Sequence, residues 1–235
     1  MPLLVHGVVP RTPRLDDAAF GDVDAPTLVA GGDLAAIVTE VAEDDLVPSR
    51  RMLLRHTQVV EAAAKQTTVV PMRFGVAVPS ADRLVEDFLA PAAERLTATI
   101  QRLQGHQEYR LRGRYDEPAA LRAVLAADPR AARLHGRRGM DAKLELGERV
   151  VQGLERRRAT DTARALEALR PVVSDVVETA VTDPLDVFAL SLLVASDAED
   201  GFDRAVESVA ESLAPEVKLE LVGPMPAYSF VEEEG

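Results

Sequence analysis

Residues 172–196 read "VVSDVVETAVTDPLDVFALSLLVAS" and contain two apolar, valine-rich runs on either side of a Thr-Asp-Pro turn sequence. Runs of this length and composition favour β-strands, and Asp-Pro favours a turn. We therefore expect strands at 172–181 and 186–196. Strands joined by so short a turn pair as antiparallel neighbours. This hairpin is the centre of the fold expected for the C-terminal half of the chain.

The segments on both sides of the hairpin complete a recognisable order of elements. An alternating strand is expected at 107–115, followed by a long helical region over 118–170 with interruptions near Asp128 and at 136–139. After the hairpin come an amphipathic helix and a last strand at 217–223. The order β-α-β-β-α-β is that of a ferredoxin-like unit, here with an enlarged first helical region.

The N-terminal half is expected to be a second α+β unit. Ser49 is placed to cap a helix, and Pro91 is expected to break or kink another one. The expected strands cover 3–9, 27–32, 34–41 and 68–78, and the second helix covers 80–104. The expected fold class is therefore α+β with two domains, 1–105 and 106–222, followed by an extended strap with an acidic tail at 223–235.

The expected strap reads "GPMPAYSF" over 223–230. Its two prolines fix their own φ angles and push the preceding residues toward extended geometry, which excludes a helix across them. In an extended chain Pro226, Tyr228 and Phe230 would lie on one side. Such an apolar edge either covers the protein's own core or docks a partner.

Bulk composition excludes several classes of function. The chain has 235 residues, no cysteine and a net charge of −12, so thiol chemistry is excluded and general nucleic-acid binding is disfavoured. No leader sequence is evident and the longest apolar stretch is about half of what spans a bilayer, so we expect a cytoplasmic protein without membrane contact. Residues 102–158 hold 14 basic against 8 acidic residues. The basic stretch indicates a solvated helix face, an acidic partner or, as the weakest alternative, nucleic acid.

No catalytic or cofactor motif is recognisable. The four histidines are scattered without metal-ligand spacing, and no glycine-rich phosphate loop or nucleophile elbow is present. His56 is expected on the buried edge of its helix, as a structural core histidine. Arg73 interrupts an apolar run, where it would pair with a carboxylate of this chain or of a partner. We expect no metal, no cofactor and no small-molecule substrate.

Several segments, in their order along the chain, resemble a known family. They are "VHGVV" (5–9), His56, "VVPMRFG" (69–75), "KLELG" (143–147) and "GPMPAYSF" (223–230). Together they are similar to the gas vesicle accessory proteins of the F/L type, and the resemblance covers essentially the whole chain. This chain departs from the usual family motifs at Val76, Met225 and Ala227, where the family commonly has Thr, Trp and Pro.

The resemblance implies a non-enzymatic protein that acts in gas vesicle assembly and is located in the cytoplasm or at the vesicle. Its implied partners are the hydrophobic shell protein and other accessory proteins. The candidate residues for partner binding or for contact between the domains are Pro71, Arg73, Phe74, Gly75, Gly223, Pro224, Pro226, Tyr228, Ser229 and Phe230. The alternative function is that of a ferredoxin-like small-molecule enzyme or sensor, with a pocket around His56 or Arg73.

Overall fold

The computed structural model describes residues 1–11, 15–20, 26–42 and 49–231. The chain divides into two compact units: unit 1 consists of Met1–Glu108 and Pro224–Gly235, and unit 2 of Tyr109–Gly223. The acidic tail at 232–235 lies outside the described residues. Both boundaries fall inside strands, because β6 (His106–Tyr115) and β9 (Val217–Met225) each contribute residues to both units.

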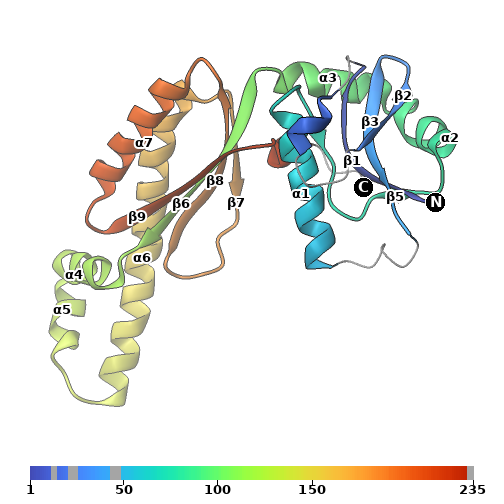
Figure 1. Cartoon of the computed structure of the whole chain (residues 1–235). Coiled ribbons are helices and arrows are strands. Elements are labelled where there is room, and N and C mark those ends of the chain that lie inside the picture. The colour runs from blue at the N-terminus through green and yellow to red at the C-terminus, as the bar shows by residue number, and fades with distance from the viewer. Residues whose placement is uncertain (12–14, 21–25, 43–48, 232–235) are drawn as a thin grey trace. The chain divides into compact units, whose positions relative to one another are not determined.

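Unit 1 contains a five-stranded sheet with the order β2-β3-β1-β4, and β5 also pairs with β1. Its helices lie against this sheet (Figure 1). The elements are β1 (Leu3–Pro10), η1 (Asp17–Phe20), β2 (Thr27–Gly31), β3 (Leu34–Glu40), α1 (Arg50–Ala64), β4 (Val70–Pro71), β5 (Ala77–Val78), α2 (Ala81–Leu84), the π-helical turn η3 (Val85–Leu89) and α3 (Ala93–Leu103).

The sheet of unit 1 is covered on both faces, which explains why β1 and β3 are almost continuously apolar. Val59, Val60 and Ala63 of α1 belong to one buried cluster with Val9 and Ile37. A second cluster joins the same strands to the helical segment from α2 to α3, through Leu84, Leu89, Leu96 and Ile100 packed with Val5, Val8, Ala36 and Val38. The strands therefore form the middle of three layers.

A β-bulge in β1 changes which side chains face each layer. The antiparallel pairing of β1 with β3 shifts in register between Val5 and Gly7. Regular alternation would place Val5 and Val8 on opposite faces, yet both belong to the same cluster. The residue inside the bulge is His6, whose side chain is fully buried. The bulge thus directs a polar ring into the core.

Two expected elements of unit 1 differ from a regular helix or strand. The expected helix at 80–104 begins at the N-cap Ser80 and is interrupted around Pro91, as predicted, but the turn before Pro91 is π-helical. The expected strand at 68–78 is wrong as a continuous strand. Only β4 and β5 are strand, and Phe74 and Gly75 form a turn between them. Gly75 has φ +102°, a conformation that favours glycine and breaks the strand.

Unit 2 contains a four-stranded sheet with the order β7-β8-β6-β9. The predicted hairpin is confirmed, because β7 and β8 pair antiparallel. The predicted interruptions of the helical region are also confirmed, since three helices occupy it and Asp128 caps the second. The elements are α4 (Glu117–Ala127), α5 (Pro129–His135), α6 (Met140–Leu169), η4 (Arg170–Val172), β7 (Asp175–Thr179), β8 (Asp186–Ala195), α7 (Glu199–Leu213) and, after β9, η5 (Tyr228–Phe230), which belongs to unit 1.

The core of unit 2 lies between its sheet and the helices α6 and α7. Leu169 of α6 and Phe202 of α7 are fully buried in one cluster with Leu111 of β6 and Leu192 of β8. The pattern of β6 alternates between buried and exposed residues, as expected for a sheet with one covered face. α6 runs beyond the sheet, where α4 and α5 lie beside it (Figure 1).

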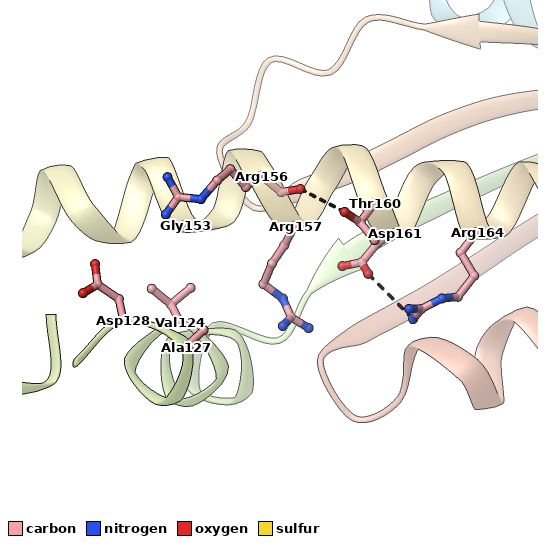
Figure 2. A pocket seen from close by; sticks show the side chains of 9 residues that line it. All are labelled: Val124, Ala127, Asp128, Gly153, Arg156, Arg157, Thr160, Asp161 and Arg164. Carbon is pink, nitrogen blue, oxygen red and sulfur yellow. Dashed lines mark hydrogen bonds and ion pairs between the residues drawn. The ribbon is translucent and has the colours of Figure 1, made fainter. Parts of the chain in front are cut away.

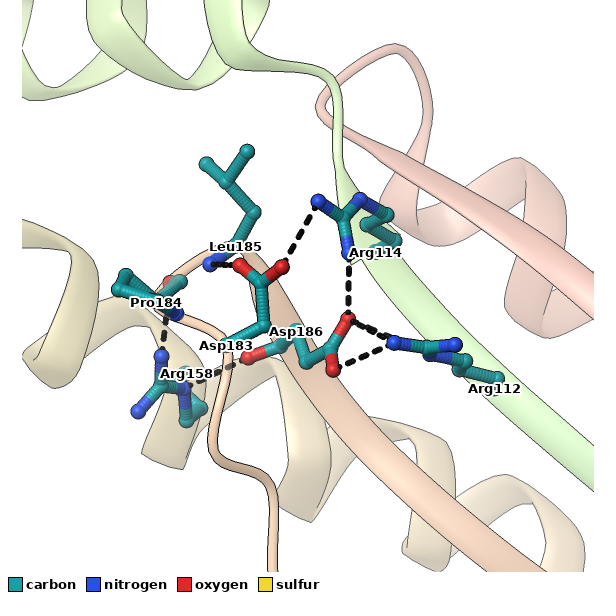
Figure 3. Close-up of polar contacts among 7 residues, drawn as sticks. All are labelled: Arg112, Arg114, Arg158, Asp183, Pro184, Leu185 and Asp186. Carbon is teal, nitrogen blue, oxygen red and sulfur yellow. Dashed lines mark hydrogen bonds and ion pairs between the residues drawn. The ribbon is translucent and has the colours of Figure 1, made fainter.

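Charged side chains fix the β7–β8 turn to its neighbours (Figure 3). Arg112 donates to both carboxylate oxygens of Asp186, at 2.9 and 2.7 Å, and Arg114 donates to Asp186 at 3.1 Å and to Asp183 at 3.0 Å. From α6, Arg158 donates to the backbone oxygens of Asp186 and Pro184, each at 2.8 Å. Two hydrogen bonds lower the pKa of the Asp183 carboxyl: the larger effect comes from the backbone amide of Leu185 and the smaller from the guanidinium of Arg114. The arginines of β6 and α6 thus hold this turn.

Gly113 in β6 lies at a closely packed position of this sheet, with no room for a larger side chain. A Cβ atom there would lie 2.7 Å from the ring of Phe188, whereas one at Gly136 would meet nothing within 4 Å. Gly113→Ala is therefore expected to lower the free energy of unfolding by about 1–3 kcal/mol, as overpacked cores do. Gly136→Ala should change it by less than about 0.5 kcal/mol. Urea denaturation of both variants measures the difference, and equal stabilities would contradict the packing described.

Candidate functional site

The C-terminal segment belongs to unit 1 from Pro224 onward, and it does not form an extended strap over its whole length. Strand geometry ends at Met225, and Tyr228–Phe230 forms a 3₁₀ turn. The expectation that Pro226, Tyr228 and Phe230 lie on one side of an extended chain is therefore wrong. Ala227 and Phe230 are buried, while Tyr228 is half-buried. The turn lets neighbouring side chains pack against different parts of unit 1.

A buried carboxylate binds this turn. Glu108 is 0% exposed, and its oxygens accept hydrogen bonds from the backbone N–H and the hydroxyl of Ser229, both at 2.8 Å. Arg102 of α3 donates to the backbone oxygen of Phe230. Charge-assisted hydrogen bonds of this kind are stronger than neutral ones. The C-terminal segment is thus bound through the predicted Ser229 and through two residues that the sequence did not single out, Glu108 and Arg102.

A small hollow brings the two predicted segments of unit 1 together. Its volume is about 170 Å³. Pro71 is the last residue of β4, and Arg73 comes from the segment between β4 and β5. Tyr228 comes from the C-terminal turn and Arg95 from α3. The complete lining is Val70, Pro71, Met72, Arg73, Val76, Phe88, Arg95, Leu96, Tyr228 and Val231. The hollow therefore combines apolar side chains with two guanidinium groups.

The other predicted residues have different places. Phe74 lies outside this lining and meets the ring of His56 edge-on, with ring centroids 5.6 Å apart. Gly75 forms the turn described above. Gly223 and Pro224 are exposed in β9, at the outer edge of the sheet order, where proline is tolerated. These residues therefore do not form a single site.

A chain of four polar groups crosses the core of unit 1. His56 Nε2 lies 2.9 Å from the backbone oxygen of Met72, His56 Nδ1 lies 3.0 Å from His6 Nδ1, and His6 Nε2 lies 3.0 Å from Thr39 Oγ1. The carbonyl can only accept, so His56 Nε2 donates and its Nδ1 accepts from His6. The hydroxyl of Thr39 then donates to His6 Nε2. This arrangement satisfies both imidazoles in their neutral form.

Burial keeps both histidines neutral. Desolvation, with smaller effects of His56 and Arg55, lowers the pKa of His6 to about 3. Desolvation also lowers the pKa of His56, although the hydrogen bond to Met72 acts in the opposite direction. His56, which the sequence predicts on the buried edge of its helix, is 2% exposed. His6 and Thr39 were not singled out, because the bulge that brings them together depends on strand pairing.

Unit 2 contains a second, larger hollow of about 390 Å³ beside α4 and α6 (Figure 2). Arg156, Arg157 and Arg164 line it. The guanidinium groups of Arg157 and Arg164 are 3.9 Å from Glu216 and Asp161, respectively, and Arg157 Nε is buried without a hydrogen-bond partner. Asp128 and Asp161 also line this hollow, so its three guanidinium groups leave a net positive lining, which suits a small anion. The sequence indicated only a basic stretch here.

Within the described ranges, no cluster of three or more His, Cys, Asp or Glu side chains is arranged to hold a metal ion. Across the same residues, no helix is long and apolar enough to cross a membrane.

Comparison with known proteins assigns the family. The family model for the gas vesicle synthesis protein GvpL/GvpF matches residues 2–232. The chain is also 33% identical to gas vesicle protein F of a Streptomyces species, over 99% of this chain and 100% of that protein. This chain belongs to the GvpL/GvpF family of gas vesicle proteins.

Other members of the GvpL/GvpF family agree in sequence and in fold. Gas vesicle protein L1 of Halobacterium salinarum is 27% identical over 90% of this chain and 83% of its own length. The crystal structure of GvpF from Anabaena has a TM-score of 0.80 at 19% identity, with 100% of this chain and 99% of that chain covered. GvpF from Microcystis aeruginosa gives 0.77 at 18% identity and 99% coverage of both. The mixed helix-and-sheet fold is thus the fold of these GvpF structures.

Proposed function

We propose that this GvpL/GvpF family member is a non-enzymatic accessory protein of gas vesicle formation that binds the hydrophobic shell protein and other accessory proteins in the cytoplasm. Family membership supports the gas vesicle context. An escort of an apolar subunit must shield apolar surface and remain soluble itself, and a net charge of −12 favours solubility.

The hollow of unit 1 is the observation that carries this proposal. It is lined by apolar side chains from both segments that resemble the family motifs, with Arg73 and Arg95 among them. Its volume of about 170 Å³ is well below the roughly 300–1,000 Å³ of usual small-molecule pockets. We infer that it accepts an apolar side chain of a protein partner, while the arginines meet polar or acidic groups beside it.

The test is a variant that fills the hollow and leaves the fold intact. Val76 lines the hollow and is half-buried, so Val76→Phe adds volume where a partner's side chain would enter. Val76 also packs against the core of unit 1, so urea denaturation should first show that the variant is folded, with a loss of stability of no more than about 1–3 kcal/mol. The variant should retain at least about tenfold less of the co-expressed shell protein than the wild type does. Affinity pull-down and size-exclusion chromatography at two salt concentrations measure this retention.

Leu54→Phe provides the matched control, because Leu54 is an exposed residue of α1 in the same unit. It should retain the shell protein as the wild type does. Undiminished binding by Val76→Phe would show that the hollow is not the site. If the wild type itself retains no shell protein at either salt concentration, the escort role proposed here is wrong.

We also propose that the two units are domains, with unit 2 a modified ferredoxin-like domain. The sheet order β7-β8-β6-β9 supports this, because the first and third strands of the unit lie together in the middle, as in a split β-α-β arrangement. The long α6, preceded by α4 and α5, forms the enlarged first helical region.

A second candidate function, that of a small-molecule sensor, is favoured by the arginine-lined hollow of unit 2. Its volume of about 390 Å³ lies within the range of ligand pockets. Inorganic phosphate and citrate are suitable probes. If the site binds anions, they should raise the melting temperature of the wild type but not that of Arg157→Gln. Equal shifts in both proteins would exclude this site.

A further inference from the structure

The N-terminal half of α6 exposes a row of large apolar side chains. Met140 is 80% exposed, Leu144 65% and Val151 50%. Together with Gly147 they follow one another at intervals of four, three and four residues, which places all four on one face of the helix. We call these four residues the α6 seam. Their spacing is that of the contact positions of a coiled coil.

The seam continues a face of α6 that is covered further along. About four and five turns beyond Val151, Ala165 and Leu169 lie on this same face and are fully buried in the core of unit 2. Between Val151 and Ala165, Thr162 donates a hydrogen bond to the backbone oxygen of Val187 in β8, at 3.2 Å. α6 extends beyond the end of the sheet (Figure 1), so its apolar face continues past the strands that cover it.

The neighbouring helices α4 and α5 cover a different face of α6. Gly153, on the side of α4, would bring a Cβ atom to 2.7 Å from Val124, and the two residues face each other in Figure 2. Arg149, on the same side, is 2.8 Å from Asp128 at the start of α5. Successive positions on a helix are 100° apart, so this side is well separated from the seam.

Gly147 is the second observation that points to a partner. Glycine within a helix costs about 0.5–1 kcal/mol relative to alanine. At Gly153 close packing against Val124 explains the residue, but a Cβ atom at Gly147 would meet nothing within 4 Å. Within the described structure, close packing therefore does not explain why residue 147 is glycine. A notch in an exposed apolar row allows a partner's side chain or backbone to approach closely.

The charge beside the seam indicates the chemistry of that partner. Asp141, Glu148 and Glu155 are exposed and follow one another at intervals of seven residues, so they form an acidic row along one side of the seam. A helix with basic residues at the facing positions would be attracted to this row. A second copy docked antiparallel would instead bring two acidic rows together, and the net charge of −12 adds repulsion.

We propose that the α6 seam docks an amphipathic helix of a partner protein, whose apolar stripe packs on Met140, Leu144 and Val151 and inserts a side chain at Gly147. Basic residues beside that stripe meet the acidic row. This surface lies in unit 2 and is separate from the hollow of unit 1, so the inference goes beyond the proposed function and does not depend on it.

A synthetic helical peptide of about three heptads tests the proposal, with leucine at the contact positions and lysine beside them. A matched peptide carries glutamate in place of lysine. Fluorescence anisotropy with the full chain should show at least about tenfold tighter binding of the lysine peptide. Leu144→Ser and Gly147→Leu should each weaken that binding by about tenfold, the first by removing apolar contact and the second by filling the notch. Both positions are exposed, so circular dichroism should show an intact fold.

Two further variants separate specific docking from general attraction of a basic peptide to an acidic protein. Glu148→Lys should weaken binding of the lysine peptide and improve binding of the glutamate peptide. Glu61→Lys, an equal charge change at an exposed position of α1, should have a much smaller effect. Equal effects of these two variants, equal affinity for both peptides, failure to bind the lysine peptide, or wild-type affinity of Leu144→Ser would each overturn the proposal. A wild-type dimer in sedimentation that Leu144→Ser disperses would assign the seam to a second copy instead.

Discussion

Replacement of Phe230 by alanine is expected to destabilise unit 1 by about 3 kcal/mol, the largest effect of any substitution considered for this protein. Phe230 is 3% exposed, and the turn that contains it is bound by Glu108 and Arg102. Truncation leaves a cavity beneath a segment that contributes only a few residues to the unit. Urea denaturation followed by circular dichroism measures the loss. Hydrogen exchange should show that the backbone of Tyr228–Phe230 loses protection first.

Leu221→Ala is the matched control, because Leu221 lies in β9 shortly before the same segment but is 40% exposed. It should change the free energy of unfolding by less than about 0.5 kcal/mol. A double-mutant cycle of Glu108→Gln with Ser229→Ala then measures the hydrogen-bond anchor, and the two changes should be strongly non-additive. Wild-type stability of Phe230→Ala would contradict the burial of this segment.

Mild acid is expected to destabilise unit 1 before most carboxylates titrate. The pKa of His6 is lowered from 6.5 to about 3 in the folded protein. The unfolded chain therefore binds more protons between these two values, and stability falls as the pH decreases from 6.5. At pH 5 the loss from His6 alone is about 2 kcal/mol relative to neutral pH. His56, whose pKa is also lowered, acts in the same direction.

The measurement is chemical denaturation at pH 7 and pH 5, which lies above the range where the lowered pKa values of Asp116, Asp128 and Asp183 matter. His6→Gln should be less stable at pH 7, because it disturbs the hydrogen bonds to His56 and Thr39, yet lose less stability on acidification. His135→Gln, at an exposed position, should behave as the wild type does. An unchanged wild-type stability between the two pH values would show that the histidines are not held neutral.

The Phe230→Ala experiment bears on the two alternative roles of the C-terminal segment, core packing and partner binding. Ala227 and Phe230 face inward, and Ser229 is committed to Glu108. Tyr228 is half-buried and lines the hollow of unit 1. Of the two alternatives at the level of sequence, core packing is thus the role of Ala227 and Phe230, and the partner binding that we propose involves Tyr228 of the same turn. Loss of binding in a Phe230 variant would reflect loss of this turn, whereas Val76→Phe tests the hollow itself.

Local sequence determined most elements of both units. Ser49, Ser80, Asp116 and Asp128 accept hydrogen bonds from backbone amides at the starts of their helices, and Asp-Pro or Gly-Gly sequences mark the turns of the hairpins. These features depend on residues within one or two turns of each other, so pattern and propensity suffice to find them. For the same reason the expected helix at 80–104 was located correctly, although its π-helical turn was not foreseen.

Long-range pairing decided the rest. The expected strand at 68–78 became two short strands with a turn at Phe74 and Gly75, because both of its ends pair with β1 across the bulge at His6. The Glu108 anchor joins residues 121 positions apart, and the contact between His6 and His56 joins residues 50 apart. The exposure of the α6 seam follows from the length of the neighbouring sheet. No local pattern encodes where a distant strand ends or which carboxylate a remote amide meets, so these features arise only when the tertiary structure forms.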